Sequence, residues 1–486
     1  NEIAVSSITT NRLADDAVTT DKIADNAITA AKLADNAIAS DAQNNTVAGT
    51  NAGDSFSGTD AVGNTLIGKD AGTAITTGDY NTAIGIGSLD TNTTGSNNTS
   101  VGSYTLDANT EGVKNTAIGS SALAANTTGT DNTAVGYDVL KANTSGVRNT
   151  AIGNYALDAN TTAYNNVAVG YEALTANTTG TGNNALGKGA AAYTTTGNYN
   201  TALGHNAFHL STTGANNTAV GKSALGSNTT ASDNTAVGTE ALYNNTTGAG
   251  NVAVGKGALD ANTTGGYNVS IGQGSLSGNT TASLNVAVGT NALQVNTTGD
   301  YNTAIGTYCL DANSTGVRNT GVGYNSLGAN TTGVDNVAVG QNALDANTTG
   351  GSNVAIGLGA ISTSTTASNN TAVGYAALNA TTDGHSNTAV GSGALDVNTT
   401  GNYNIGIGRD SLQANTTGAN NVAVGKSALY SNTTASSNTA VGHDALLANT
   451  TGHSNTAVGS GALDVNTTGE KNIAVGIYSL DANTTG

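Results

Sequence analysis

Residues 336–352, which read NVAVGQNALDANTTGGS, contain the pattern that decides the fold. The pattern begins again at Asn353 and repeats every 17 residues. Its glycine occupies all 25 positions from Gly68 to Gly476, with no insertion or deletion. A globular fold absorbs length changes in its loops, whereas a stacked coil needs each residue to lie over its counterpart. The unbroken period therefore predicts a solenoid.

The residue types within one unit predict its local structure, with the opening Asn counted as unit position 1. Thr or Val, Ala, and Val or Ile at positions 2 to 4 favour a short strand, and Gly at position 5 favours a corner with positive φ. Leu at position 9 anchors a second apolar segment, and Asn-Thr-Thr-Gly at positions 12 to 15 is typical of a turn. A helical repeat is the alternative, but fixed glycines and Thr-Thr pairs disfavour helix. We predict an all-β, parallel β-solenoid (β-roll) of 17-residue coils.

The chain divides into three predicted segments. Residues 1–43 carry a ten-residue repeat, as in VTTDKIADNA and ITAAKLADNA, whose five-residue apolar spacing fits neither one helix face nor one strand face. Intertwined chains could bury these residues, so we expect a trimeric stalk here. Residues 44–63 are expected to be a transition segment, and residues 64–486 the solenoid rod.

The strand at positions 2 to 4 is apolar on both faces. Positions 2 and 4 share one face, and the Ala at position 3, as in Ala83 and Ala168, points to the other. A strand that is apolar on both faces is normally buried on both, so one face needs a partner surface unless Ala merely tolerates exposure. A closed homo-oligomer provides such a surface, and we predict a homotrimer.

The two rows of asparagine in the repeat, at positions 1 and 12, are expected to have different roles. The Asn at position 1 is expected to form a ladder of amides that bond to the coils above and below. The Asn at position 12, as in Asn92, is replaced in four units by Thr194, Ser211, Ser364 and Thr381. That variability predicts a turn and not an interior ladder.

Composition excludes several classes of function. The net charge of −18 argues against nucleic acid as a partner, because phosphates require clustered Lys and Arg. No apolar run is long enough to span a bilayer, so no membrane insertion is expected. The single Cys309 excludes a disulfide framework.

Candidate catalytic and metal-binding residues are few, and no enzyme activity, cofactor or metal is expected. Glu172 and Glu240 share a unit position but lie four units apart, too far for a carboxylate pair. Asp occurs often at position 10, where Asp90 with Asp107 and Asp464 with Asp481 are in successive units and could bridge a cation, although a solvated acidic face is favoured. His205 and His209 are interpreted as surface or turn residues, and Cys309 as a buried thiol.

Surface features leave further alternatives open. The Asn-Thr-Thr turns also match the glycosylation sequon, although turn chemistry explains them. The threonine rows suggest ice binding as a remote alternative, but the two Thr of each unit are adjacent and do not alternate along a strand. Any binding is expected at positions 6, 7, 16 and 17, which carry most of the Tyr, Lys and Arg.

The repeat resembles the Asn-Ser-Val-Ala-Ile-Gly motif in the head repeats of trimeric autotransporter adhesins. The resemblance implies a left-handed roll that packs as a trimer, with Val167 and Val169 on one side of the strand, Ala168 on the other, and a corner at Gly170. The unit here is longer than the adhesin unit, and no neck or membrane barrel is recognisable. The residues that carry the motif are Asn81, Ala83, Ile84, Gly85 and Leu89 in one stretch, and Asn166, Val167, Ala168, Val169, Gly170 and Leu174 in another.

The ten-residue repeats are similar to repeats in bacteriophage tail-fibre proteins. Together the two resemblances imply the shaft of a tail fibre, located in the virion tail or on an extracellular surface. Such a shaft would contact itself and other virion or filament subunits, and would reach a host receptor through a tip outside this sequence. The alternative is a bacterial surface adhesin or extracellular filament of the same fold.

Overall fold

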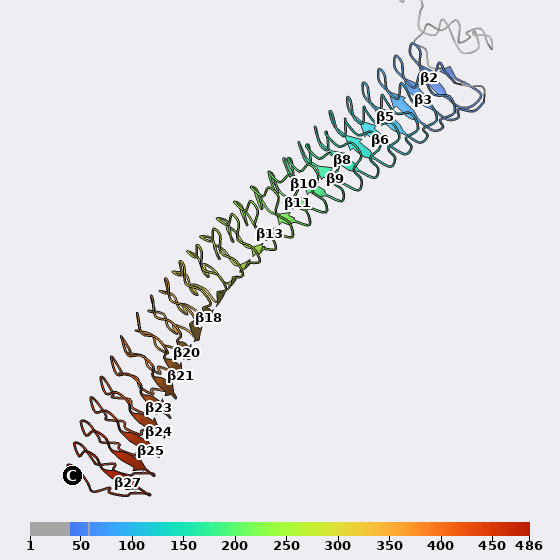
Figure 1. Cartoon of the computed structure of the whole chain (residues 1–486). Helices are drawn as coiled ribbons and strands as arrows, with labels where there is room; N and C mark the ends of the chain where they lie inside the picture. The colour runs from blue at the N-terminus through green and yellow to red at the C-terminus, as the bar shows by residue number, and fades with distance from the viewer. Residues whose placement is uncertain (1–38, 57–58) are drawn as a thin grey trace, which may run out of the picture. The chain divides into compact units, whose positions relative to one another are not determined.

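The computed structural model describes residues 39–56 and 59–486. They belong to two compact units, one ending at Thr179 and the other running from Gly180 to Gly486. The described residues form strands and turns and contain no helix. In each unit the chain winds as a stack of coils with one strand in each coil (Figure 1). The predicted all-β parallel solenoid is therefore confirmed, whereas the stalk predicted for the N-terminal repeats lies almost entirely outside the described residues.

The strands are short and evenly spaced. The first unit contains β1 (Ala39–Ser40), β2 (Thr46–Ala48), β3 (Thr65–Ile67), β4 (Thr82–Ile84), β5 (Thr99–Val101), β6 (Thr116–Ile118), β7 (Thr133–Val135), β8 (Thr150–Ile152) and β9 (Val167–Val169). The second unit contains β10 (Asn184–Leu186), β11 (Thr201–Leu203), β12 (Thr218–Val220), β13 (Thr235–Val237), β14 (Val252–Val254), β15 (Val269–Ile271), β16 (Val286–Val288), β17 (Thr303–Ile305), β18 (Thr320–Val322), β19 (Val337–Val339), β20 (Val354–Ile356), β21 (Thr371–Val373), β22 (Thr388–Val390), β23 (Ile405–Ile407), β24 (Val422–Val424), β25 (Thr439–Val441), β26 (Thr456–Val458) and β27 (Ile473–Val475).

Within each unit, successive strands pair in parallel and in the same register. In β19 and β20, for example, Ala338 pairs with Ala355 and Val339 with Ile356, 17 residues apart. The same offset holds from β3 to β9 and from β10 to β27. Each side chain therefore stacks on the equivalent side chain of the next coil, which explains why no insertion interrupts the repeat.

The N-terminal edge of the first unit departs from this regular spacing. β2 pairs in parallel with β3 through Thr46 and Thr65, an offset of 19 residues, and β1 pairs with β2 antiparallel. The stretch expected to be a transition segment therefore includes a strand of the ladder. Asp41 takes the place of a preceding Asn, because its carboxylate accepts hydrogen bonds from the backbone N–H of Asn45 at 2.8 Å and from the Asn45 amide at 2.8 Å.

The glycine at position 5 is required by the distance between coils. Gly340 has φ of +133°, and a Cβ built on it would lie 2.6 Å from the carbonyl oxygen of Gly357 in the next coil. A side chain there would meet both an unfavourable backbone conformation and a steric clash. The predicted corner with positive φ is confirmed.

The leucine at position 9 combines a strained backbone with complete burial. Leu344 has φ of +52° and is fully buried, and the other leucines of this row share both properties except Leu480 in the last coil, which has a positive φ but is 50% exposed. The left-handed conformation costs a non-glycine residue about 1–2 kcal/mol. Burial of a leucine side chain contributes about 1.5–3 kcal/mol, which offsets that cost. The core is thus a narrow stack of Leu from position 9 and Ala from position 3.

The asparagine at position 1 forms the predicted ladder. The backbone N–H and the side-chain amide of Asn268 both donate to Oδ1 of Asn251, at 2.9 and 3.1 Å. The Asn268 amide also donates to the Ala282 carbonyl at 2.9 Å. Because Asn268 is fully buried, these bonds satisfy polar groups that water cannot reach.

The asparagine at position 12 was predicted to lie outside the interior, and that prediction is wrong. Asn262 is fully buried, and its amide donates to Oδ1 of Asn245 at 2.8 Å and to the Gly265 carbonyl at 2.9 Å. The residue therefore holds the turn and forms a second interior ladder at the same time. Small hydroxyl side chains fit the same buried site, and the four replacements, Thr194, Ser211, Ser364 and Thr381, are all fully buried.

Adding even a methyl group at the position 5 corner should destabilise the fold. Gly340→Ala should lower the melting temperature by several degrees and accelerate amide hydrogen exchange in the coils around it, because the methyl group forces the coils apart. Ser392→Ala, at the exposed position next to another corner glycine, serves as the control and should change stability by less than about 0.5 kcal/mol. Equal stability of the two variants would contradict the steric role of the corner.

Removing one asparagine from the position 1 ladder should destabilise the protein, because the buried groups that it bonds to lose their hydrogen-bond partner. Asn268→Ala removes the acceptor for the Asn285 N–H, at 3.0 Å, and the donor to the Ala282 carbonyl. Two buried polar groups without partners should destabilise the protein by about 2–4 kcal/mol, measured by chemical denaturation. Thr264→Ala, at an exposed turn position, is the matched control. A loss no larger than in the control would refute the ladder's contribution.

Candidate functional site

The outward side of the strands is the main candidate for a functional surface. Ala355 in β20 is fully buried, whereas Ile356 next to it is 39% exposed. The same alternation recurs along both units, so Ala at position 3 faces the coil interior and positions 2 and 4 face outward. We call the side chains at positions 2 and 4 the outer face.

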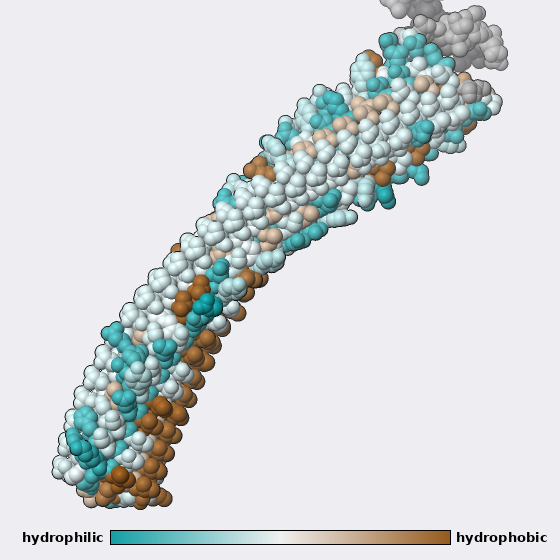
Figure 2. Space-filling view, in the orientation of Figure 1, coloured by the Kyte–Doolittle hydropathy of each residue, from teal (hydrophilic) through white to brown (hydrophobic). Residues whose placement is uncertain are grey.

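On the outer face of the second unit, the side chains at position 4 form a continuous apolar stripe. Position 2 is β-branched in every strand except β10, where it is Asn184. Figure 2 shows the aliphatic side chains gathered along the edge of this unit where β20 to β27 lie. Position 4 is aliphatic throughout: Leu186, Leu203, Val220, Val237, Val254, Ile271, Val288, Ile305, Val322, Val339, Ile356, Val373, Val390, Ile407, Val424, Val441, Val458 and Val475.

The motif residues in the first unit occupy the same places. Asn81, Ala83 and Leu89 are fully buried, as are Asn166, Ala168 and Leu174. Ile84 is 37% exposed and Val167 39% exposed, and Val169 is half-buried. Gly85 and Gly170 form corners with φ of +135° and +139°. Most of the motif therefore builds the coil, and its outward members belong to the outer face.

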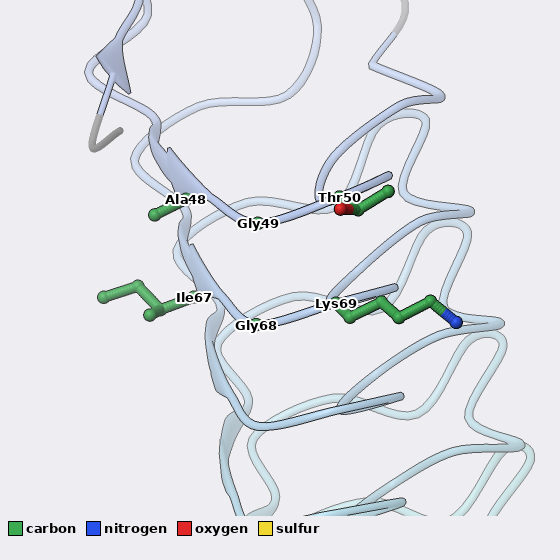
Figure 3. A pocket seen from close by; sticks show the side chains of 6 residues that line it. All are labelled: Ala48, Gly49, Thr50, Ile67, Gly68 and Lys69. Atoms are coloured by element: carbon green, nitrogen blue, oxygen red, sulfur yellow. The ribbon is translucent and has the colours of Figure 1, made fainter. Parts of the chain in front are cut away.

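The corner glycine separates the outer face from the neighbouring side of the coil. A shallow pocket of about 250 Å³ lies at the corner of the first coils, where Ile67 points away from the coil on one side of Gly68 and Lys69 runs along the other (Figure 3). Lys69 lies 3.1 Å from the Asp70 carboxylate. Hydrogen bonds from Asn51 and Lys69 lower the pKa of Asp70. The pocket is lined by aliphatic groups, glycines, one hydroxyl and this paired ammonium, and no carboxylate is among its described lining residues.

The aspartates of position 10 lie half-buried along the coils, except Asp481 in the last coil, which is exposed. Burial and the nearby Asp90 charge raise the pKa of Asp107. Burial likewise raises the pKa of Asp158, Asp260, Asp311, Asp345 and Asp396. Among residues 39–56 and 59–486, no three His, Cys, Asp or Glu side chains gather in a way that could hold a metal ion.

The remaining sequence candidates are dispersed. Glu172 lies half-buried in the first unit, and Glu240 is exposed in the second. Cys309 is fully buried, and burial raises its pKa to about 12, so its thiol stays protonated at neutral pH. His209 is half-buried, and its Nδ1 lies 2.9 Å from the Gly189 carbonyl oxygen. In the described part of the chain, no apolar helix of membrane-spanning length occurs.

Sequence reasoning recognised that both strand faces are apolar but did not determine which one faces out. The signal lay in side-chain volume, because a narrow coil already filled by Leu has space only for Ala opposite it. The larger Val and Ile at position 4 must then be outside. The outer face was therefore readable from residue size once the coil diameter was known.

No protein-family model matches the chain, and no curated protein matches it significantly. The geometry and the sequence resemblances are therefore the basis for the function proposed below.

The position 10 carboxylates predict a pH-dependent stability. A carboxyl whose folded pKa is raised contributes stability below its unfolded pKa, about 3.9, and that stability is lost as pH rises through the folded value. Asp345→Asn should therefore raise the melting temperature at pH 7, and the gain should vanish near pH 3.

Asp335→Asn, one coil earlier, is the control with the opposite sign. A hydrogen bond from Arg318 lowers the pKa of Asp335, so this pair contributes stability above the unfolded pKa and loses it as pH falls. Asp335→Asn should be neutral or slightly destabilising at pH 7. Scanning calorimetry of both variants at pH 3 and 7 provides the measurement, and a parallel pH response of the two would contradict the assignment.

Proposed function

We propose that the chain is a passive structural shaft that assembles with copies of itself through the outer face. The observation that carries the proposal is the apolar stripe. With an aliphatic side chain at position 4 of all 18 strands, the second unit exposes on the order of 1,000 Å² of apolar surface, more than soluble monomers usually leave exposed. No Asp, Glu, Lys or Arg interrupts it at positions 2 to 4.

A second copy of the chain is the partner that fits this stripe best. Because the coils are stacked in register, each side chain of the stripe lies over its counterpart in the next coil. The spacing between the two is about 4.8 Å. A like stripe with the same repeat allows β-branched side chains to interdigitate along its whole length. About 800 Å² for each partner is enough for a stable interface.

We propose a trimer with the outer faces around the threefold axis. A closed ring buries every stripe and leaves none for further growth, so it yields a fibre of defined thickness. The similarity of the repeat to trimeric adhesin heads supports three copies over two. The side chains at positions 6, 7, 16 and 17 then remain on the outside.

The biological role proposed is the shaft of a phage tail fibre that spaces a receptor-binding tip from the virion during host attachment. The ten-residue repeats at the N-terminus, which resemble tail-fibre repeats, support this role and a location in the virion tail. An extracellular adhesin or filament of the same fold is the second candidate, supported by the resemblance of the head repeats. Antibodies against the chain should label the tail fibres of purified phage particles; labelling of bacterial cell surfaces alone would replace the first role with the second.

The trimer predicts that a charge on the outer face disrupts assembly without unfolding the coil. Ile356→Lys places three ammonium groups around the axis, and burial of unpaired charges should weaken association by at least about 100-fold. Leu358→Lys is the matched control, since Leu358 is 52% exposed but lies beyond the Gly357 corner. Analytical ultracentrifugation should find trimers for the wild type and the control, and monomers for Ile356→Lys. A monomeric wild type would refute the assembly.

A further inference from the structure

A slot on the second unit, away from the outer face, combines an aromatic ring with neutral polar groups. It has a volume of about 80 Å³ and spans three successive coils between Asn206 and Tyr243. Its lining residues come from unit positions 7, 10 and 11. The outer face uses positions 2 and 4, so the slot stays accessible whether or not the chain assembles.

The two walls of the slot are rings separated by a glycine. His209, Gly226 and Tyr243 occupy position 10 in three successive coils. Two coils correspond to roughly 10 Å, so the two side chains start from backbone positions with one coil between them. The Tyr243 ring lies over Gly226, where its Cε2 would be 2.8 Å from an added Cβ. The missing side chain therefore lets the phenol ring settle against the coil while 40% of the residue stays exposed.

The imidazole of His209 is held in one orientation. Its Nδ1 lies 2.9 Å from the Gly189 carbonyl oxygen, and its ring meets the Tyr193 ring edge to face at 5.1 Å. A carbonyl oxygen can only accept, so Nδ1 carries the hydrogen. In the neutral ring, Nε2 is then an acceptor, and it makes no hydrogen bond to the residues that the structure describes. His209 thus lines the slot with an imidazole that the preceding coil holds in place.

The other groups in the slot are neutral donors and acceptors. Asn206, Ser223 and Ser227 line it as neutral polar residues, and Leu210, which is 44% exposed, is its aliphatic member. No carboxylate, ammonium or guanidinium is among the lining groups. This composition disfavours anions and metal ions and suits a small, uncharged molecule with several hydroxyl groups and one apolar face.

The coils next to the slot depart from the repeat more than others do. Position 9, otherwise Leu or Ile in the coils from Leu89 on, is Ala191 and then Phe208, and position 12, otherwise mostly Asn, is Thr194 and then Ser211. Ala191 and Phe208 are stacked neighbours and are both buried, so a small residue accommodates a large one. Phe208 directly precedes His209, and its buried side chain anchors the backbone at His209 in the core.

We propose that this slot binds one pyranose residue of a neutral glycan. The Tyr243 ring would cover the C–H face of the sugar, and the His209 Nε2, the Asn206 amide and the two serines would bond its hydroxyl groups. The ligand makes contacts on the side of the molecule and not at an end. The inference goes beyond the shaft function proposed above and does not depend on the oligomeric state.

The test is saturation-transfer NMR of the full-length protein with methyl glycosides of glucose, galactose, mannose, N-acetylglucosamine and rhamnose as probes. At least one glycoside should receive saturation from the wild-type protein. Tyr243→Ala should weaken its binding at least about fivefold, since it removes the stacking surface. His209→Phe should also weaken binding, because it keeps the ring contact with Tyr193 but removes the acceptor.

Tyr267→Ala is the matched control. The Tyr267 ring also lies over a glycine, Gly250, and is 68% exposed, but it is not part of the slot. This variant should bind as the wild type does, and all variants should keep the wild-type circular dichroism spectrum. The proposal is overturned if no glycoside receives saturation from the wild type, or if Tyr243→Ala and Tyr267→Ala bind equally.

Discussion

The close vertical contact between coils is the constraint on which the rest of the structure depends. At the position 5 corner, one backbone lies so near the next that a single methyl group would contact the carbonyl of Gly357 at 2.6 Å. Only glycine fits there, and only when every coil has the same length. The period of 17 residues, the invariance of the corner and the parallel register of the strands are consequences of this one contact.

Stacking at this distance also explains how a chain with 9% charged residues and 4% aromatic residues forms an ordered interior. Each coil has little apolar volume, so the burial of Leu at position 9 is needed, and it offsets the energetic cost of the left-handed backbone there. The two asparagine ladders carry hydrogen bonds through the interior, where Asn268 and Asn262 each bond to the preceding coil. Polar ladders of this kind fix the vertical register more strictly than apolar contacts, because a shifted amide would lose its partners.

The stacking that provides hydrogen-bond partners for the buried polar groups also aligns apolar side chains on the outside of the coils. Since equivalent residues align, one aliphatic residue in the repeat becomes a stripe along a whole unit, which a globular fold would scatter over its surface. The surface is therefore divided by unit position. The strands present a uniform side suited to self-association, whereas positions 6, 7, 10, 11, 16 and 17 vary and allow local features such as the slot beside Tyr243.

The sequence by itself determined the period, the all-β solenoid, the glycine corner and the ladder at position 1, because each of these follows from residue type at a fixed spacing. Only the tertiary structure decided which strand face is interior, since alternation along a strand looks the same from both sides when Ala355 and Ile356 are both apolar. It also placed the position 12 asparagines inside, although their variability had indicated a turn alone. The slot could not be predicted, because Asn206, His209 and Tyr243 meet only when coils 17 residues apart are stacked. The sequence determines which residues each coil contains. The stacking of the coils determines which of those residues lie on the surface, in the core or in a site.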